Sequence, residues 1–136
     1  MINMDSCIFC KIVAGELPSH KVYEDAETLA FLDIRPVNPG HTLVIPKEHY
    51  QNMEDVPEAV LAAVMSSVKK VGRLLKDKLG VPGYNIGENN DPIAGQLVPH
   101  LHFHVMPRRE GDGYQLWPQR SQEAGEMASI IAKLKS

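Results

Sequence analysis

The sequence predicts an α+β fold, in which an antiparallel sheet of about five strands packs against one long helix and shorter N- and C-terminal helices. Several short segments have the alternation of a strand and are bounded by turn residues. One long segment has apolar residues at helical spacing. Strands and helices do not alternate strictly, as they would in a parallel sheet. The expected strands cover residues 22–24, 28–33, 41–45, 84–88 and 100–106.

The long helix is expected from Asp55 to about Leu79. Asp55 and Glu58 have the spacing of a capping box, and Pro57 is tolerated in the first turn. Gly80 is a typical stop signal just beyond the last helical residue. One stripe of the helix is apolar and should be buried; it consists of Val60, Leu61, Val64, Val68, Val71 and Leu75.

The terminal helices are expected over residues 6–14 and 122–134, and the serine that opens the first is a plausible N-cap. The chain contains no internal repeat and no linker long enough to separate two domains. We therefore expect a single domain over residues 1–136, with a core at about 7–108 and a C-terminal tail at 109–136.

The composition is that of a globular protein, with 43% apolar and 23% charged residues. The net charge of −3 argues against a broad nucleic-acid-binding surface, which needs a basic stripe, but not against a mononucleotide. No apolar run approaches the length of a membrane span, and the first residues lack the features of a signal peptide. We expect a cytoplasmic protein with neither a membrane nor a nucleic-acid partner.

The segment from Pro99 to Pro107 carries three histidines in alternation with apolar residues. On a strand this period places His100, His102 and His104 on one face, with neighbours about 7 Å apart. Such a row suits a phosphate-bearing substrate or a shared metal ion, and packing alone explains it poorly. Histidine–phosphate chemistry, a metal site and a structural role all stay open at this point.

Polar residues upstream of the row favour the phosphate interpretation. Gly95 allows the backbone to approach a ligand closely, and Gln96 offers both an amide donor and an acceptor. Asn89 lies in the same turn-rich segment and is within reach of a polar substrate atom. Asp33 follows apolar strand residues, where a carboxylate needs a polar partner.

Three ordered segments strongly resemble the histidine triad (HIT) superfamily: FLDI at 31–34, GHTLVIP at 40–46, and the row with its two following apolar residues at 100–106. The resemblance covers about residues 7–108. It implies a HIT-like fold and a hydrolase or nucleotidyl transferase. The substrates would be purine nucleoside phosphoramidates or dinucleoside polyphosphates, cleaved at the α-phosphorus.

The resemblance also implies the roles of individual residues. His102 would attack the α-phosphorus and form a nucleotidyl-histidine, which water then cleaves. His104 would hydrogen-bond a phosphate oxygen, Gln96 would orient the phosphate or leaving group, and His41 would support the row. The residues implied in nucleotide binding are Ile8, Phe9, Ile12, Phe31, Asp33, Ile34, Asn89, Gly95, Gln96, His102 and His104.

Two features of the sequence leave room for other interpretations. Periodicity alone favours plain core packing for the five apolar members, whereas Asp33 is expected to bind the ribose hydroxyls. Leu97 departs from the resemblance, because a small hydroxyl residue commonly follows the Gly–Gln pair there. The alternatives are an adenine-nucleotide-binding module with negligible turnover, and a zinc-binding protein that uses the histidine row.

A CxxC pair stands near the N-terminus, at Cys7 and Cys10. In a reducing compartment such a pair favours a metal or redox role over a structural disulfide. The resemblance implies a zinc site with His49 and His100 as the other two ligands, closed and therefore structural. The alternative is two packed, reduced cysteines beside a surface histidine.

The resemblance further implies a homodimer with the long helix near its two-fold axis. The C-terminal tail would reach toward the partner's site. Trp117 and Pro118 stand in this tail, where residues often shape substrate choice, and local packing of an irregular segment is the alternative for both.

Overall fold

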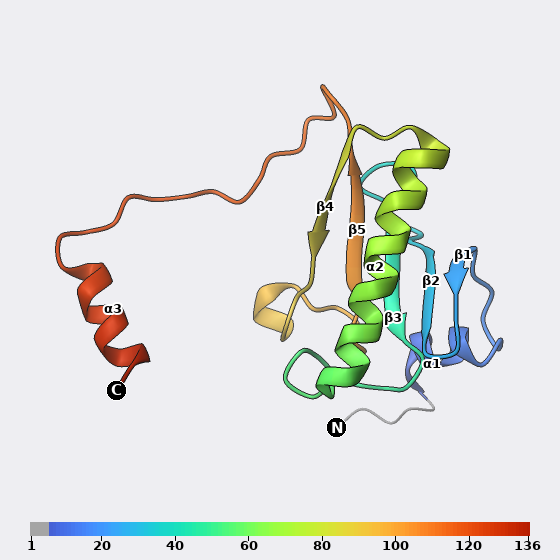
Figure 1. The fold of residues 1–136 in the computed structure, drawn as a ribbon, viewed down its shortest axis with the longest axis horizontal. Helices are drawn as coiled ribbons and strands as arrows, with labels where there is room; N and C mark the ends of the chain where they lie inside the picture. The colour runs from blue at the N-terminus through green and yellow to red at the C-terminus, as the bar shows by residue number, and fades with distance from the viewer. Residues whose placement is uncertain (1–5) are drawn as a thin grey trace.

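The computed structural model describes residues 6–136. Five strands form one antiparallel sheet in the order β1-β2-β3-β5-β4 (Figure 1). This confirms the predicted α+β fold, with one long helix and two shorter ones. The elements in chain order are α1 (Ile8–Val13), β1 (Lys21–Glu24), β2 (Thr28–Leu32), β3 (Thr42–Pro46), α2 (Glu58–Leu79), β4 (Gly83–Gly87), the 3₁₀ turn η2 (Pro92–Ala94), β5 (Phe103–Arg108) and α3 (Glu126–Leu134).

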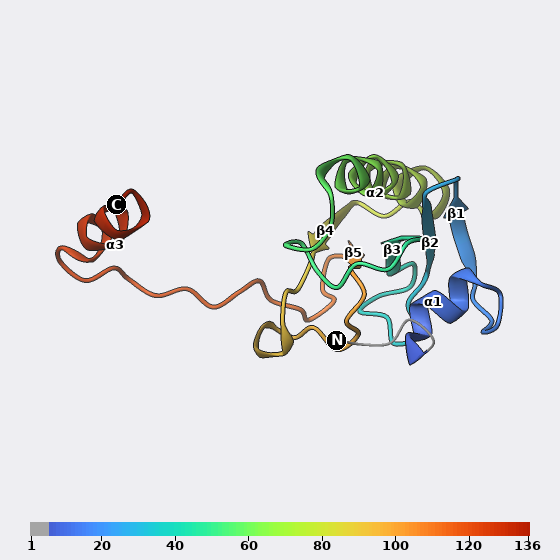
Figure 2. The ribbon, with the colours of Figure 1, turned by 90° about the horizontal axis from the view of Figure 1, so that it is seen from below.

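Helix α2 lies across one face of the sheet and encloses the main hydrophobic core (Figure 2). Four residues of its predicted stripe are buried, and the two nearest the start of the helix are partly buried. The amphipathic spacing therefore predicted this interface correctly. The facing core residues are Ala30, Val44, Leu101, Phe103 and Val105.

The two ends of α2 differ from each other in how they are capped. Gly80 ends the helix in the left-handed conformation, with φ +66°, as predicted. The predicted capping box is wrong, because α2 begins at Glu58 and its N-cap, Pro57, has no side-chain cap. Asp55 lies in the preceding turn, where its carboxylate accepts the backbone N–H of Gln51 at 2.9 Å.

Helix α1 lies on the opposite face of the sheet from α2 (Figure 2). The helix begins at Ile8, one residue later than expected, because its N-cap is Cys7 and not the predicted Ser6. The Cys7 Sγ accepts the backbone N–H of Cys10 at 3.4 Å. The core on this face joins Phe9 of α1 to Leu29, Phe31, Leu43 and Ile45 of the sheet.

The strand register places one row of residues across the α1 face. His104 on β5 lies opposite Leu43 on β3, Leu43 opposite Phe31 on β2, and Phe31 opposite Lys21 on β1. Directly opposed residues share one face of a sheet. Adjacent strands are about 4.8 Å apart, so the row spans about 14 Å from β5 to β1.

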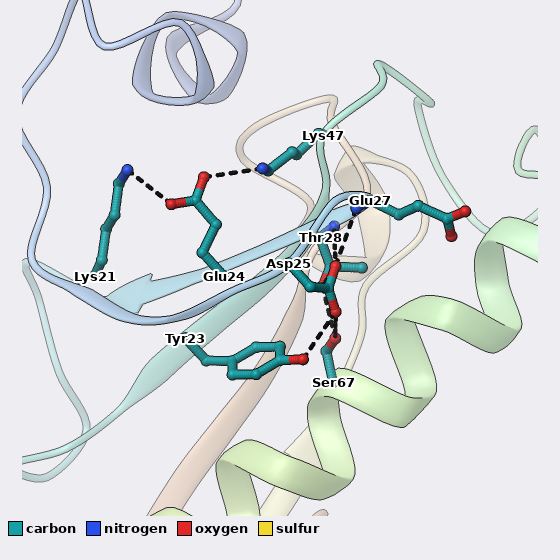
Figure 3. Close-up of polar contacts among 8 residues, drawn as sticks. All are labelled: Lys21, Tyr23, Glu24, Asp25, Glu27, Thr28, Lys47 and Ser67. Carbon is teal, nitrogen blue, oxygen red and sulfur yellow. Dashed lines mark hydrogen bonds and ion pairs between the residues drawn. The ribbon is translucent and has the colours of Figure 1, made fainter.

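The turn between β1 and β2 is tied to α2 by Asp25 (Figure 3). Its Oδ1 accepts the backbone N–H groups of Glu27 and Thr28 and the hydroxyl of Thr28, at 2.8–3.0 Å. Its Oδ2 accepts the hydroxyls of Tyr23 at 2.9 Å and of Ser67 on α2 at 3.4 Å. Burial raises the pKa of Asp25, but the hydrogen bonds outweigh it and lower the pKa to about 2.

Asp25→Asn is expected to lower the free energy of unfolding at pH 7 by about 1–2 kcal/mol, because an amide accepts these hydrogen bonds more weakly. The pKa of Asp25 is lower in the fold than in the unfolded chain. Its stabilisation is therefore complete above about pH 4 and is lost as the pH falls toward 2. Denaturant unfolding across this pH range measures both effects. Equal stability of the two proteins at pH 7 would contradict this role of Asp25.

Beyond β5 an irregular arm, residues 109–125, leads to α3, and both lie away from the sheet in Figures 1 and 2. Helix α3 begins at Glu126, four residues later than predicted, because Gly125 before it adopts φ +78°. No residue of α3 is buried. Its exposed large apolar side chains are Met127, Ile130, Ile131 and Leu134. No helix within residues 6–136 is long and apolar enough to cross a membrane.

Candidate functional site

The alternation in the histidine segment is present in the fold, although the strand begins later than predicted. Strand β5 starts at Phe103, so His100 and His102 lie in the irregular segment that leads into it. The side chains of Leu101, Phe103 and Val105 are buried in the α2 core. The histidines therefore lie on the α1 side of the sheet.

The backbone sets the tautomer of His102. Its Nδ1 lies 2.7 Å from the carbonyl oxygen of His100, which can only accept a hydrogen bond, so the proton is on Nδ1. The lone pair is consequently on Nε2. The ring packs edge-on against those of Phe9 and His104, with centroids 5.2 and 5.1 Å apart, and this packing fixes its orientation.

A second chain of hydrogen bonds sets the tautomer of His104. The backbone N–H of Val37 donates to His41 Nδ1 at 2.9 Å, so neutral His41 carries its proton on Nε2. That Nε2 lies 2.9 Å from His104 Nδ1 and donates to it. The proton of His104 is therefore on Nε2, where it is available as a donor to a ligand.

Burial keeps this row of imidazoles neutral. Burial lowers the pKa of His41 and of His102 below the usual histidine value, against the opposing effect of the Asp33 carboxylate. Burial and the neighbouring histidines lower the pKa of His104 to about 4. At neutral pH the site thus combines one unprotonated nucleophilic nitrogen with one neutral hydrogen-bond donor.

A cavity of about 640 Å³ opens beside His102 and His104 on the α1 face. Both histidines and His41 line it. The other sequence-predicted nucleotide-binding residues that line it are Ile8, Phe9, Ile12, Phe31, Asp33, Ile34, Asn89 and Gly95. The structure therefore gathers residues from four separate parts of the chain around one space.

Gln96 is buried and does not line the cavity. Its Oε1 accepts the backbone N–H of Asp91 at 2.8 Å, and its Nε2 donates to the carbonyls of Gln51 and Val98. These bonds hold the loop in front of the histidines. Gly95 next to it adopts φ +94°, a conformation that favours glycine.

Asp33 stands at the edge of the cavity, directly after β2. Its Oδ1 accepts the backbone N–H of Arg35 at 2.8 Å, and its Oδ2 lies 3.6 Å from His41 Nε2. Asp33, His41 and His104 bring three possible metal-ligand atoms within 4.8 Å of one another. The His41 Nε2 proton already points at His104, however, so this cluster is a hydrogen-bond relay and not a cation site.

The side chains of the two cysteines lie close to those of two histidines at the N-terminus of α1. Cys7 Sγ lies 3.4 Å from His100 Nδ1, and Cys10 Sγ lies 3.4 Å from His49 Nδ1 and 3.6 Å from His100 Nδ1. His100 Nε2 donates to the carbonyl of Pro46 at 2.9 Å, so its Nδ1 lone pair faces the sulfurs. All four ligand atoms lie within 4.8 Å of one another.

These distances fit a tetrahedral zinc ion. The usual Zn–S and Zn–N bond lengths imply sulfur–nitrogen edges of about 3.5 Å. Burial, and then Cys7, raise the pKa of the Cys10 thiol to about 11, so a metal ion would have to displace its proton. His100 thus belongs to the cysteine cluster, and the three histidines of the row do not converge on one ion.

Comparison with known proteins agrees with this geometry. The HIT domain family matches residues 14–111 of the chain. The chain belongs to the HIT family. An adenosine 5'-monophosphoramidase of Candida albicans is 40% identical to it over 141 residues, covering 99% of this chain and 93% of the fungal protein. This HIT-family chain thus aligns with that relative over nearly its whole length.

Two solved structures extend the comparison of this HIT-family protein. A HIT family member from Bacillus subtilis has a TM-score of 0.87 and 40% identity, covering 96% of this chain and 95% of that one. A zinc-bound histidine triad family protein from Mycobacterium smegmatis has a TM-score of 0.79 and 37% identity, covering 98% of both chains. The zinc ion is a property of that second protein.

Sequence reasoning missed part of the cavity of this HIT-family protein. Ser19 and His20, from the segment that connects α1 to β1, line it beside Pro18. Leu43 on β3 also lines it, between His104 and Phe31 in the strand register. No local motif marks these residues, because only the pairing of strands distant in sequence brings them to the site.

Proposed function

We propose that this HIT-family hydrolase releases the nucleoside monophosphate from purine nucleoside phosphoramidates through a nucleotidyl intermediate on His102. The observation that carries the proposal is the free Nε2 lone pair of His102 beside the cavity, since Nδ1–H donates to the carbonyl of His100. The activity named for the Candida albicans relative supports this substrate class.

The reaction proceeds in two displacements at the α-phosphorus. His102 Nε2 forms a bond to phosphorus, and the electron pair of the broken P–N bond leaves with the amine, which takes up a proton. Water then attacks the same phosphorus, the bond to His102 breaks, and AMP is released. His104 Nε2–H donates to a non-bridging oxygen, where negative charge develops.

The remaining residues of the cavity position the nucleotide. The second carboxylate oxygen of Asp33 accepts from the ribose hydroxyls, while Oδ1 stays bonded to the backbone. Phe9 and Phe31 pack against the base, together with Ile8, Ile12 and Ile34, and Asn89 and Gly95 lie at the phosphate side. Gln96 is a positioning residue that acts through the loop it holds.

The charge of the cavity favours phosphoramidates over dinucleoside polyphosphates. Apart from its histidines, the described residues that line it carry two formal charges, those of Arg35 and Asp33, which offset each other. His41, His102 and His104 are neutral, because burial lowers the pKa of each. A single phosphate charge suits such a site, whereas several bridging phosphates have no cation to offset them.

We expect kcat/KM to be at least about tenfold higher for adenosine 5'-phosphoramidate than for a diadenosine tetraphosphate. Leu97 is exposed and lines the cavity, so Leu97→Lys adds a cation there. This variant should lower the kcat/KM ratio of phosphoramidate to tetraphosphate several-fold. Leu97→Gln is the uncharged control and should leave it unchanged. A wild-type preference for the tetraphosphate would contradict the charge argument.

Leu97 also favours the second candidate function, a nucleotide-binding module that turns its ligand over negligibly. Leucine supplies no side-chain donor to the phosphate or leaving group, although it lines the cavity. Single-turnover release of AMP from adenosine 5'-phosphoramidate separates the two functions. Release supports the hydrolase, whereas tight binding of AMP without any release supports the binding module.

A structural zinc ion is the second part of the proposal. Cys7, Cys10, His49 and His100 would hold it, and the ligand distances and the His100 tautomer support this assignment. Four protein ligands close the coordination shell, so the ion supplies rigidity and leaves no position for a substrate. A reducing compartment such as the cytoplasm would keep both thiols available as ligands.

We also propose that the protein works as a homodimer. The arm and α3 support this, because α3 presents Met127, Ile130, Ile131 and Leu134 to solvent within one chain. Trp117 on the arm is 78% exposed, so its large apolar ring is also available to pack against a second subunit. Sedimentation equilibrium should give twice the chain mass for residues 1–136, whereas the mass of a single chain would contradict the proposal.

A further inference from the structure

The segment between α1 and β1 forms one end of the cavity. Pro18, Ser19 and His20 all line it, and Ser19 is half-buried while His20 is exposed. The carbonyl of His20 accepts the backbone N–H of Leu32 at 3.0 Å, which fixes the segment beside the end of β2. The backbone that carries these polar side chains is therefore held in place.

These two side chains make no polar contact within the described part of the fold. Within residues 6–136, neither the Ser19 hydroxyl nor the His20 imidazole has a hydrogen-bond or ion-pair partner. Of the six histidines, His41, His102 and His104 lie together beside the cavity and His49 and His100 lie with the cysteines, so His20 is the one that belongs to neither group. The hydroxyl and the imidazole are thus free to bind a ligand.

The strand register gives the distance from the phosphate site to this segment. His104, Leu43, Phe31 and Lys21 form one row, from β5 through β3 and β2 to β1, about 14 Å long. An extended purine nucleotide spans about two strand spacings, or about 10 Å, from phosphorus to the far edge of its base. With phosphorus at the catalytic histidines, the base therefore lies over Leu43 and Phe31.

The far edge of the base then lies about one strand spacing, about 4.8 Å, from the β1 end of this row, beside which Ser19 and His20 line the cavity. Phe9, Ile12 and Phe31 contact the flat faces of a base through apolar surface, which does not distinguish one purine from another. The base edges differ in their donors and acceptors. An imidazole presents two ring nitrogens that can hydrogen-bond, and a serine hydroxyl both donates and accepts.

We infer that Ser19 and His20 bind the edge of the nucleobase and set the base preference of the site. The inference rests on the proposed function only in that it places the phosphorus beside His102. It assigns specificity to two residues that the catalytic chemistry does not use. Both residues belong to the binding site and leave the nucleophile unchanged.

The test is calorimetric binding of AMP and of purine riboside 5'-monophosphate, which lacks the 6-amino group. The wild type should bind AMP about three- to tenfold more tightly, as the loss of one or two neutral hydrogen bonds implies. His20→Ala and Ser19→Ala should each reduce this ratio, mainly by weakening AMP binding. In the double variant the ratio should fall below about twofold, with the affinity for purine riboside monophosphate nearly unchanged.

Lys21→Ala is the matched control, because Lys21 is the next residue and does not line the cavity. It should leave both affinities unchanged. A wild type that binds both nucleotides equally, or variants that lose affinity for both to the same extent, would overturn the inference while the proposed function stands. Failure of the proposed function gives a different result. The wild type would still bind AMP more tightly than purine riboside 5'-monophosphate, but it would release no AMP from adenosine 5'-phosphoramidate.

Discussion

Replacing His102 with alanine is expected to lower single-turnover release of AMP from adenosine 5'-phosphoramidate by at least about 10⁴-fold. The substitution removes the nitrogen proposed to form the covalent bond, and neither neighbouring imidazole, His41 or His104, has a free lone pair to take its place. His104 Nδ1 already accepts a hydrogen bond from His41 Nε2–H, and His104 Nε2 carries its own proton. The measurement is rapid-quench kinetics with enzyme in excess.

AMP binding separates loss of chemistry from loss of the site. The affinity of His102→Ala for AMP should stay within about threefold of wild type, because the base and ribose contacts are made elsewhere in the cavity. His104→Ala should lose about 10²–10³-fold in rate, as expected for removal of one donor to the developing charge. A His102→Ala protein that releases AMP at the wild-type rate would rule out this nucleophile.

Loss of the proposed zinc site is expected to lower both stability and nucleotide affinity. Cys7 and Cys10 belong to the start of α1, and the same short helix supplies Phe9 to the cavity. Phe9 packs against the rings of both His100 and His102. A metal ion that fixes α1 therefore also fixes one wall of the nucleotide site.

Cys7→Ser should lower the thermal midpoint by about 10 °C and weaken AMP binding several-fold. Elemental analysis should find about one zinc ion per wild-type chain and much less in the variant. Ser66→Ala on the exposed side of α2 is the control and should change neither property. A wild type purified without zinc, with the same midpoint after addition of the metal, would contradict the structural zinc site.

The fold could be predicted from the sequence wherever one local period dominates. The stripe of α2 and the alternation around Phe103 each point one face toward the core, and both are found there. The helix starts were less predictable, because they depend on competing local bonds. Asp55, for example, binds the N–H of Gln51, and Pro57 takes the capping position.

The site was predictable to the extent that its chemistry is local in sequence. The CxxC pair and the alternating histidines stand out in the chain, and the structure places His100 with the cysteines and His102 with His104. The tautomers of His100 and His104 depend on long-range contacts, with the carbonyl of Pro46 and with His41 respectively. No sequence pattern reports these contacts, nor the place of His20.

In the proposed mechanism, His102 becomes covalently bonded to the nucleotide during turnover. The most direct test mixes the protein with excess adenosine 5'-phosphoramidate, quenches it within the first turnover under conditions that preserve a phosphorus–nitrogen bond, and measures the intact protein mass. We expect an added mass of one adenylyl group, mapped to the peptide that contains His102 and absent from His102→Ala. AMP release with no adduct at any time, or an adduct on another residue, would contradict it.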